Sequence, residues 1–259
     1  MASGCLSQAT QPLTRPAEHA VRSEQLLVMS DFELPKDHPL ILDLVELRKQ
    51  VARELNLSLQ GEPVVVYLFR NEPEYRSFIE ATYPDLPPRR AYFVGTPKEL
   101  AVYTFWGERI QEDLRHEFTH GLLHASLSEV PLWIDEGLAE YFEVAGAGPG
   151  EVNKQYVEQL TTALGNSWRP DLQRLERLTD FPQMQRIDYQ ESWAWVHFML
   201  HSTPDTQAAL LAYLNDLRSG STDVPLSERL EEVHPQVAER FTNYLASLQG
   251  IGTQFSSLP

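Results

Sequence analysis

The feature that most constrains this chain is a pair of histidines four positions apart, in the pentapeptide HEFTH at residues 116–120. On an α-helix, two such residues lie about 6 Å apart along the axis and about 40° apart around it. His116 and His120 can therefore reach one metal ion. Glu117 points to a neighbouring sector of the helix, where its carboxylate can take a proton from the attacking water without competing as a ligand. The pattern predicts two metal ligands and a general base.

The surrounding segment, residues 108–127, has the pattern of an amphipathic helix. Acidic residues crowd its first turns, which suits the positive end of the helix dipole. The histidines lie off the apolar face, so they are free to meet a ligand; two structural or solvated histidines are the alternative. The residues expected to face the core share helical spacing: Ile110, Leu114, Phe118, Gly121, Leu122 and Ala125.

A zinc site of this kind needs a third protein ligand and an open fourth position. His124 lies eight positions beyond His116, about 12 Å along the helix axis, which is too far to share the ion. We expect it to be a packed or surface histidine. The pattern of the metzincin class of zinc peptidases would place a third histidine at position 126, but that residue is Ser126. Glu136 is the better candidate, because Pro131 can open a second helix that folds back against the first.

Two segments, HEFTH at 116–120 and WIDEGLAEY at 133–141, together resemble the gluzincin class of zinc metallopeptidases. The second segment is similar to the W-x-x-E-G-x-A-x-Y signature of the peptidase MA-like families. The resemblance implies one Zn²⁺ per chain, with Glu136 as its third ligand. It also implies that Glu140 accepts a hydrogen bond from a zinc-binding histidine. The upstream sequence has no GxMEN-like stretch, which argues against an exopeptidase.

The same resemblance suggests a role for Tyr189, in the segment DYQESWAWVHF. Gluzincins commonly supply a Tyr or His from their C-terminal helical part to stabilise the oxyanion formed when water attacks an amide. A tyrosine that caps a helix or packs in the core is the alternative. His197 and Tyr141 are weaker candidates and are expected in the core.

Composition excludes several classes of function. The chain has 259 residues and is 42% hydrophobic, enough for a substantial buried core. Its formal charge of −16 argues against a nucleic-acid partner, because phosphate binding needs clustered Lys and Arg. The single cysteine, Cys5, follows Ser3-Gly4 and resembles the end of a bacterial lipobox. A lipidated Cys5 would tether the protein to a membrane and favours the bacterial cell envelope or secretion; an incidental cysteine is the alternative.

The N-terminal part reads as a tail followed by alternating helices and strands. Residues 1–25 are predicted to be a disordered leader or tether, and structure is expected to begin near residue 37. Asp37 is a plausible cap for the first helix. The last predicted strand, before the HEFTH helix, is expected to be a sheet edge that binds an extended peptide; an interior strand is the alternative. The predicted elements are helices at 38–56 and 73–82 and strands at 64–69, 91–94 and 100–105.

Beyond Tyr141 the pattern becomes almost entirely helical. The Gly-rich stretch at 145–150 is a hinge or lid candidate, with a surface turn as the simpler alternative. The segment at 192–201 is apolar on nearly all sides and is expected to be buried. Further helices are predicted at 205–218 and 226–248.

These observations predict an α+β, zincin-like fold with the active cleft between its two halves. The expected divisions are a leader at 1–25, an N-terminal α/β subdomain with both metal helices at 26–145, and a helical C-terminal subdomain at 146–259. The predicted function is a zinc-dependent peptidase acting on a peptide or protein substrate. The alternative is a catalytically silent, zinc-holding scaffold or peptide-binding module, although such a decayed enzyme would be expected to have lost Glu117.

Overall fold

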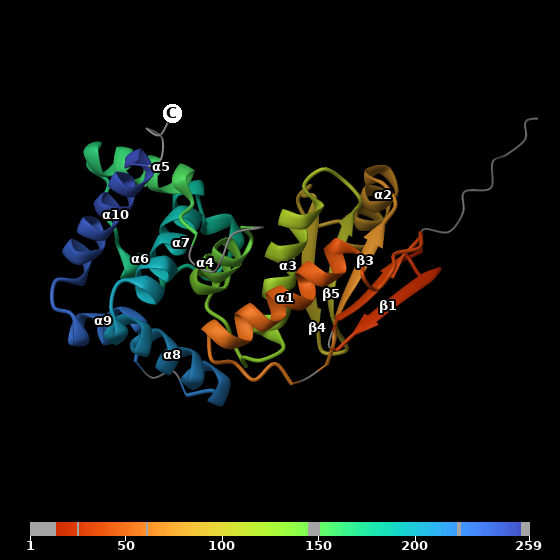
Figure 1. Ribbon diagram of the computed structural model, residues 1–259, viewed down its shortest axis with the longest axis horizontal. Coiled ribbons are helices and arrows are strands. Elements are labelled where there is room, and N and C mark those ends of the chain that lie inside the picture. The colour runs from red at the N-terminus through yellow and green to blue at the C-terminus, as the bar shows by residue number, and fades with distance from the viewer. Residues whose placement is uncertain (1–13, 25, 61, 145–150, 222–223, 255–259) are drawn as a thin grey trace, which may run out of the picture.

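The chain folds into a sheet half followed by a helical half, as Figure 1 shows, so the predicted α+β class is confirmed. The computed structural model describes residues 14–24, 26–60, 62–144, 151–221 and 224–254. Cys5 and the glycine-rich stretch at 145–150 lie outside the described residues, as does the boundary predicted between the two subdomains.

A five-stranded mixed sheet forms the core of the first half. Its strand order is β1-β2-β3-β5-β4, with β2, β3 and β5 parallel and the two outer strands antiparallel to their neighbours. The central pairing sets Val66 opposite Val102, and both are fully buried. The strands are β1 His19–Ser23, β2 Leu26–Ser30, β3 Val64–Phe69, β4 Ala91–Thr96 and β5 Glu99–Phe105.

The prediction that structure begins near residue 37 is wrong, because β1 and β2 precede it. β2 pairs in parallel with β3, and β1 is added outside it. The disordered leader therefore cannot extend to residue 25. Five-residue strands give a weak local signal, and this hairpin joins the sheet through the pairing of β2 with β3, which is distant in sequence.

The expected edge strand is also misplaced. The strand before the HEFTH helix, β5, lies between β3 and β4 and is therefore interior. The short antiparallel strand β4 is the outer strand on that side of the sheet. Edge position depends on strand order, which local sequence does not determine.

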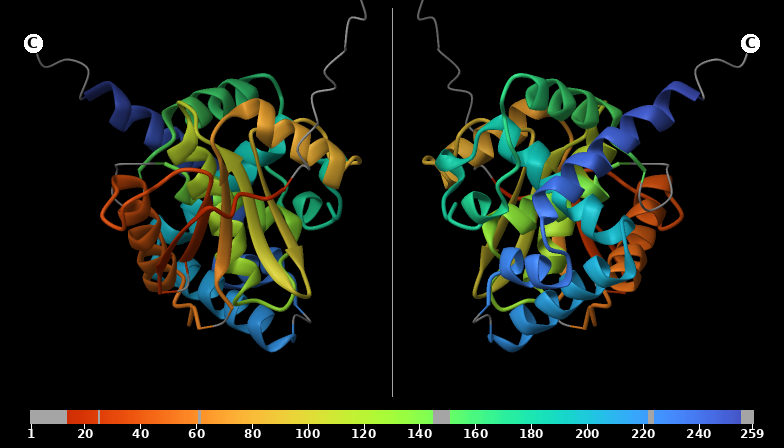
Figure 2. Two further views of the ribbon diagram at one scale, coloured as in Figure 1. Left: turned by 90° about the vertical axis from the view of Figure 1, so that its right-hand side faces the viewer. Right: turned by 90° about the vertical axis from the view of Figure 1, so that its left-hand side faces the viewer.

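Helices cover both faces of the sheet (Figure 1 and Figure 2). On one face, α1 and α3 pack on alternate residues of the central strands, including Val64, Val66 and Val102. On the other face, α2 packs on the opposite set, including Tyr67 and Tyr103. The helices of this half are α1 Pro39–Glu54, α2 Glu72–Thr82 and α3 Ile110–His124.

The helical half is built around α4 and the buried α7. The predicted helix at 226–248 is two helices, because Pro235 interrupts it and Gln236 has a φ of 64°. Among the described residues, no helix is both long enough and apolar enough to cross a bilayer. The helices are α4 Leu132–Phe142, α5 Lys154–Gly165, α6 Leu172–Leu175, the 3₁₀ helix η1 Phe181–Gln183, α7 Arg186–His201, α8 Pro204–Ser219, α9 Leu226–Val233 and α10 Val237–Gln254.

Candidate metal centre

The two histidines are carried by α3, whose apolar face packs against the sheet. Leu114, Phe118 and Leu122 are buried there, as their spacing predicts. Gly121 lets the helix approach β3 closely, because a Cβ at that position would lie 2.6 Å from Val64 Cγ1. The packing turns His116 and His120 toward the opposite side of α3, where they face α4.

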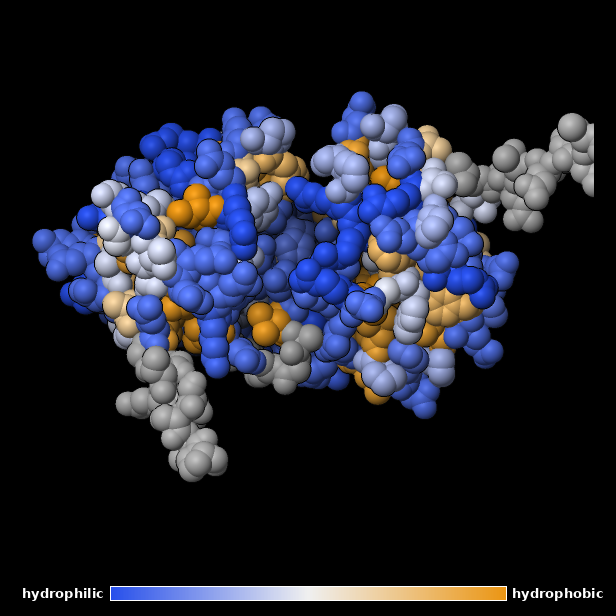
Figure 3. Space-filling view, turned by 90° about the horizontal axis from the view of Figure 1, so that it is seen from above, coloured by the Kyte–Doolittle hydropathy of each residue, from blue (hydrophilic) through white to orange (hydrophobic). Residues whose placement is uncertain are grey.

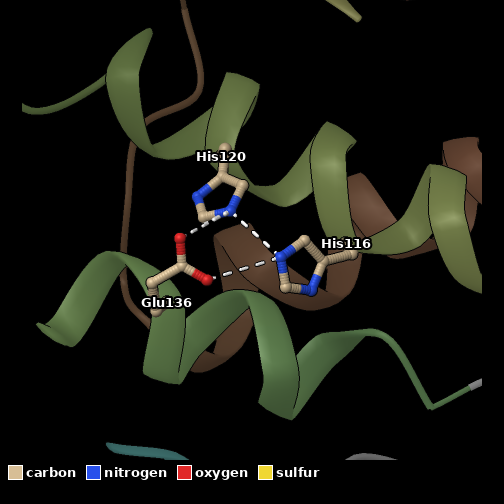
Figure 4. Close-up of side chains that lie close together, drawn as sticks. All are labelled: His116, His120 and Glu136. Carbon is tan, nitrogen blue, oxygen red and sulfur yellow. Dashed lines mark hydrogen bonds and ion pairs between the residues drawn. The ribbon is translucent and has the colours of Figure 1, made fainter. Parts of the chain in front are cut away.

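The third member of the group comes from α4, which is pressed against α7. A Cβ at Gly137 would lie 2.7 Å from the backbone oxygen of Ser192, so a glycine is needed for this close approach. The preceding residue, Glu136, is only 2% exposed. Figure 4 shows its carboxylate and the two imidazoles pointing toward one another between the two helices.

The spacing of these three side chains fits a metal ion. The Nε2 atoms of His116 and His120 are 3.2 Å apart. Glu136 Oε2 lies 3.6 Å from His116 Nε2, and Oε1 lies 3.8 Å from His120 Nε2. Ligand atoms bound at about 2.0–2.1 Å in a tetrahedral site lie about 3.3 Å from one another. The three residues can therefore hold one ion, with a donor set of two imidazoles and a carboxylate.

Two further carboxylates orient the histidines from behind. Glu143 Oε2 lies 3.0 Å from His116 Nδ1, and Asp135 Oδ1 lies 2.9 Å from His120 Nδ1. A carboxylate beside Nδ1 favours the tautomer that carries its proton on Nδ1. In a neutral ring of this tautomer, Nε2 presents a lone pair. These lone pairs and the Glu136 carboxylate then converge on one point. Only a cation, either a proton or a metal ion, relieves the repulsion among them.

The pKa values show how strongly this group attracts a cation. Burial would lower the pKa of His116, but the carboxylates of Glu136 and Glu143 outweigh it and raise the pKa well above the ordinary value. Burial also opposes protonation of His120, yet Asp135 and Glu136 raise its pKa to about 9. The pKa of Glu136 is lowered, because its contacts with both histidines exceed the cost of its burial.

Glu140 does not hold a histidine as predicted. Its carboxylate accepts a hydrogen bond of 2.7 Å from Tyr156, and the contact with His116 Nδ1 is made by Glu143. Burial, followed by the nearby charge of Glu143, raises the pKa of Glu140 to about 8. His116, Glu140 and Glu143 also bring ligand atoms within 4.8 Å of one another, so the two trios form one connected cluster through His116.

The group opens on a cavity of about 660 Å³ between the two halves of the molecule. Its lining includes Glu117, Glu136 and Tyr189, so the structure brings the predicted base and the predicted oxyanion donor to the metal group. In Figure 3 the surface is hollowed between the halves, and mostly hydrophilic residues border the hollow. One oxygen of Glu117 accepts a hydrogen bond of 2.6 Å from the backbone N–H of Phe93 in β4.

Tyr189 is half-buried, and the guanidinium of Arg89, which precedes β4, lies close to its hydroxyl. Burial and the charge of Glu136 raise the pKa of the tyrosine, and Arg89 offsets only part of this. The hydroxyl therefore remains protonated at neutral pH and can donate a hydrogen bond into the cavity.

The structure keeps His124 out of the ligand group, as expected. Its Nε2 lies 3.0 Å from Asp135 Oδ2, so Asp135 joins it to His120. Sequence reasoning missed Asp135, Glu143 and Arg89. Glu143 could have been found, because it lies seven positions after Glu136, on the same helical face. Arg89 lies in a loop, where no periodicity indicates which way a side chain points.

A family model described as "Protein of unknown function (DUF1570)" matches residues 112–227, from the first turn of α3 into α9. The matched segment contains His116, His120, Glu136 and Tyr189. Among curated proteins, none matches the chain. The matched part of the chain thus holds the candidate metal group and the helices that support it.

Proposed function

We propose that this protein is a zinc-dependent peptidase of the gluzincin kind, with His116, His120 and Glu136 as the zinc ligands. The observation that carries the proposal is the convergence of these three side chains beside a cavity that also contains a glutamate and a tyrosine. Two histidines and one glutamate, with an open fourth position, are the donor set of several catalytic zinc sites. When bound, zinc would activate a water molecule and polarise the substrate carbonyl.

Glu117 acts as the general base. Phe93 holds one carboxylate oxygen, Oε2, and this fixes the orientation of the side chain. The other oxygen, Oε1, accepts the proton of the attacking water, and the carboxyl group later donates it to the leaving amine. Glu117 follows the first ligand directly along α3, so the base and both histidine ligands are positioned by one rigid helix.

Tyr189 stabilises the negative charge that develops on the carbonyl oxygen. The nearby guanidinium of Arg89 makes this hydroxyl a stronger donor, because the positive charge polarises its O–H bond. Arg89 is thus a positioning residue for Tyr189. Its positive charge also interacts with the carboxylates of Glu117 and Glu136 and so balances charge in the cavity.

A zinc-holding module that binds peptides without cleaving them is the second candidate. The hydrogen bond from the Phe93 N–H to Glu117 favours this candidate, because it occupies one of the two carboxylate oxygens of the proposed base. The outer strand β4 then serves as the docking site for an extended peptide.

The test combines metal analysis with a cleavage screen on protein purified without a histidine tag. The parent should bind one zinc per chain and cleave some members of a broad quenched-peptide set. Glu117→Gln should keep its zinc and lose turnover, whereas Glu136→Ala should lose zinc. Tyr189→Phe should keep zinc and lower kcat about 10²- to 10³-fold, the usual effect of removing one oxyanion donor.

Equal zinc content in Glu136→Ala and the parent would sink the ligand assignment. One zinc per chain with no cleavage by the parent would favour the peptide-binding module. A protein without zinc after loading and dialysis would exclude both.

A further inference from the structure

A second cavity, of about 450 Å³, adjoins the metal group on the side of His120. Glu117, His120 and Glu136 form part of its wall, so it is continuous with the candidate active site. Apolar side chains from three separate parts of the chain make up most of the rest of the lining. These are Leu86, Tyr92, Phe93, Val130, Leu132 and Phe181, and they define what we call the apolar pocket.

The rim of the apolar pocket exposes large hydrophobic side chains to water. Phe181 is 50% exposed and Leu86 is 37% exposed, and both lie at this cavity. The guanidinium of Arg89 lies 5.7 Å from the centre of the Phe181 ring. Exposed apolar side chains that border a concave apolar surface are typical of a binding site, because a bound apolar group removes both surfaces from water.

The cavity on the other side of the metal group has the opposite character. Charged side chains dominate its lining, including Arg90, Arg186, Glu112 and Glu143. A peptide that crosses the metal group would therefore have an apolar environment on one side of the cleaved bond and a charged one on the other.

The direction of the outer strand β4 determines which cavity receives the amino-terminal side of a bound peptide. The strand runs from Ala91, which lines the charged cavity, to Gly95, which lines the apolar pocket. The N–H of Phe93, midway along, points away from β5 toward Glu117, so this edge of β4 faces the metal group. Glu117 holds the Phe93 N–H, so an added strand would use the other backbone groups of this edge. Such a strand pairs more stably in the antiparallel sense, which is also how β4 pairs with β5. The amino-terminal part of such a peptide lies beside Gly95.

Resting on the proposed peptidase function, we infer that the apolar pocket binds a large apolar side chain, aromatic or long aliphatic, on the amino-terminal side of the cleaved bond. A volume of about 450 Å³ lies within the range of pockets that take small organic groups, so it has room for a phenylalanine or leucine side chain. Phe93 and Phe181 would contact its ring or branch.

The experiment has two arms, and the first is a cleavage profile. The zinc-loaded protein digests a proteome-derived peptide pool, and mass spectrometry identifies the residues beside each cut. We expect Phe, Leu, Met and Tyr to be enriched before the cut. Phe181→Ala should lower kcat/KM for such peptides about tenfold, so that they lose their advantage over peptides with alanine at that position. Leu86→Glu should shift the preference toward Lys and Arg. The matched control is Leu42→Glu, since Leu42 is 54% exposed on α1, and it should keep the parental profile.

The second arm measures binding and needs no turnover. The affinities of phenylalanine, leucine, alanine and aspartate hydroxamates for the zinc-loaded protein are compared by calorimetry. We expect phenylalanine and leucine hydroxamates to bind more tightly than the other two, and Phe181→Ala to remove the difference.

The two arms separate failure of the inference from failure of the proposed function. Cleavage without an apolar preference, unchanged in Phe181→Ala, would overturn the pocket assignment and leave the peptidase intact. A ranking of hydroxamates that depends on Phe181, with no cleavage of any peptide, would support the pocket and refute the peptidase. Equal hydroxamate affinities and no cleavage would overturn both.

Discussion

Four carboxylates from residues 135–143 surround the two histidines, and each has a different contact. Glu136 faces both Nε2 atoms, Asp135 and Glu143 each approach one Nδ1 atom, and Glu140 is held by Tyr156. Of these, only Asp135 and Glu143 lie beside a ring Nδ1, where a carboxylate fixes the orientation of the imidazole and makes it a more basic ligand. The structure therefore assigns different effects on metal affinity to side chains of the same charge.

This difference is testable with neutral, nearly isosteric substitutions. Glu143→Gln and Asp135→Asn should each lower zinc affinity about 10- to 100-fold, as loss of a carboxylate behind a histidine ligand usually does. Glu140→Gln is the matched control and should cost less, because its carboxylate contacts Tyr156. Competition with a chromogenic chelator measures all three. A greater loss of zinc affinity in Glu140→Gln than in Glu143→Gln would contradict this. It would support Glu140 as the partner of a zinc-binding histidine, as the family resemblance implies.

Zinc affinity should also depend on pH. The pKa of His120 is raised to about 9 in the metal-free protein, so its proton stabilises the folded state below about pH 6.5, and this contribution is lost as pH rises through about 9. Zinc needs the unprotonated ring, and hence its apparent affinity should rise from pH 6.5 to 9. Calorimetry in two buffers of different ionisation enthalpy should show fewer protons released per zinc at higher pH. An affinity that is constant over this interval would contradict the raised pKa.

At the scale of helices and strands, glycines set how closely the metal helices approach their neighbours. Gly137→Ala should lower the free energy of unfolding by about 1–3 kcal/mol, because the added methyl meets the backbone of α7 and not a movable side chain. The matched control is Gly165→Ala at the end of α5, where no atom lies within 4 Å of the added Cβ. Urea denaturation compares the two variants. Equal stability would mean that α4 and α7 separate easily.

The elements that the sequence predicted well are those with strong local patterns. Strand 64–69 and the helix around HEFTH were predicted from runs that need no knowledge of their neighbours. The pairing of β2 with β3 and the interior position of β5 depend on strand order, which periodicity does not encode. The same division holds in the site. His116 and His120 followed from helical spacing, and Glu136 from a second helix opened by Pro131 together with a resemblance. The contact between Arg89 and Tyr189 depends on how a loop lies across the cleft.

At the scale of the whole molecule, the metal group joins the two halves. His116 and His120 belong to α3, which packs on the sheet, whereas Glu136 belongs to α4, which packs on α7. A bound ion would thus add a link between halves that are also joined by direct contacts, such as the hydrogen bond from Arg115 Nε to the backbone oxygen of Phe142. Removing zinc with a chelator should lower Tm and increase amide hydrogen exchange in α3 and α4 more than in the buried strand β3. Exchange that rises equally in all three would indicate global destabilisation without loss of a link.

The hydrogen bond between Glu117 and the Phe93 N–H has a consequence for solubility. An outer strand with unpaired backbone groups can pair with the same strand of another copy, and proteins avoid this by covering such groups. Glu117 covers one N–H of β4 and places a negative charge beside it. Glu117→Ala should therefore self-associate at high concentration, whereas Glu117→Gln, which keeps an oxygen acceptor, should stay monodisperse like the parent in analytical ultracentrifugation. Glu117, the proposed general base, would then also prevent β4 of one molecule from pairing with β4 of another.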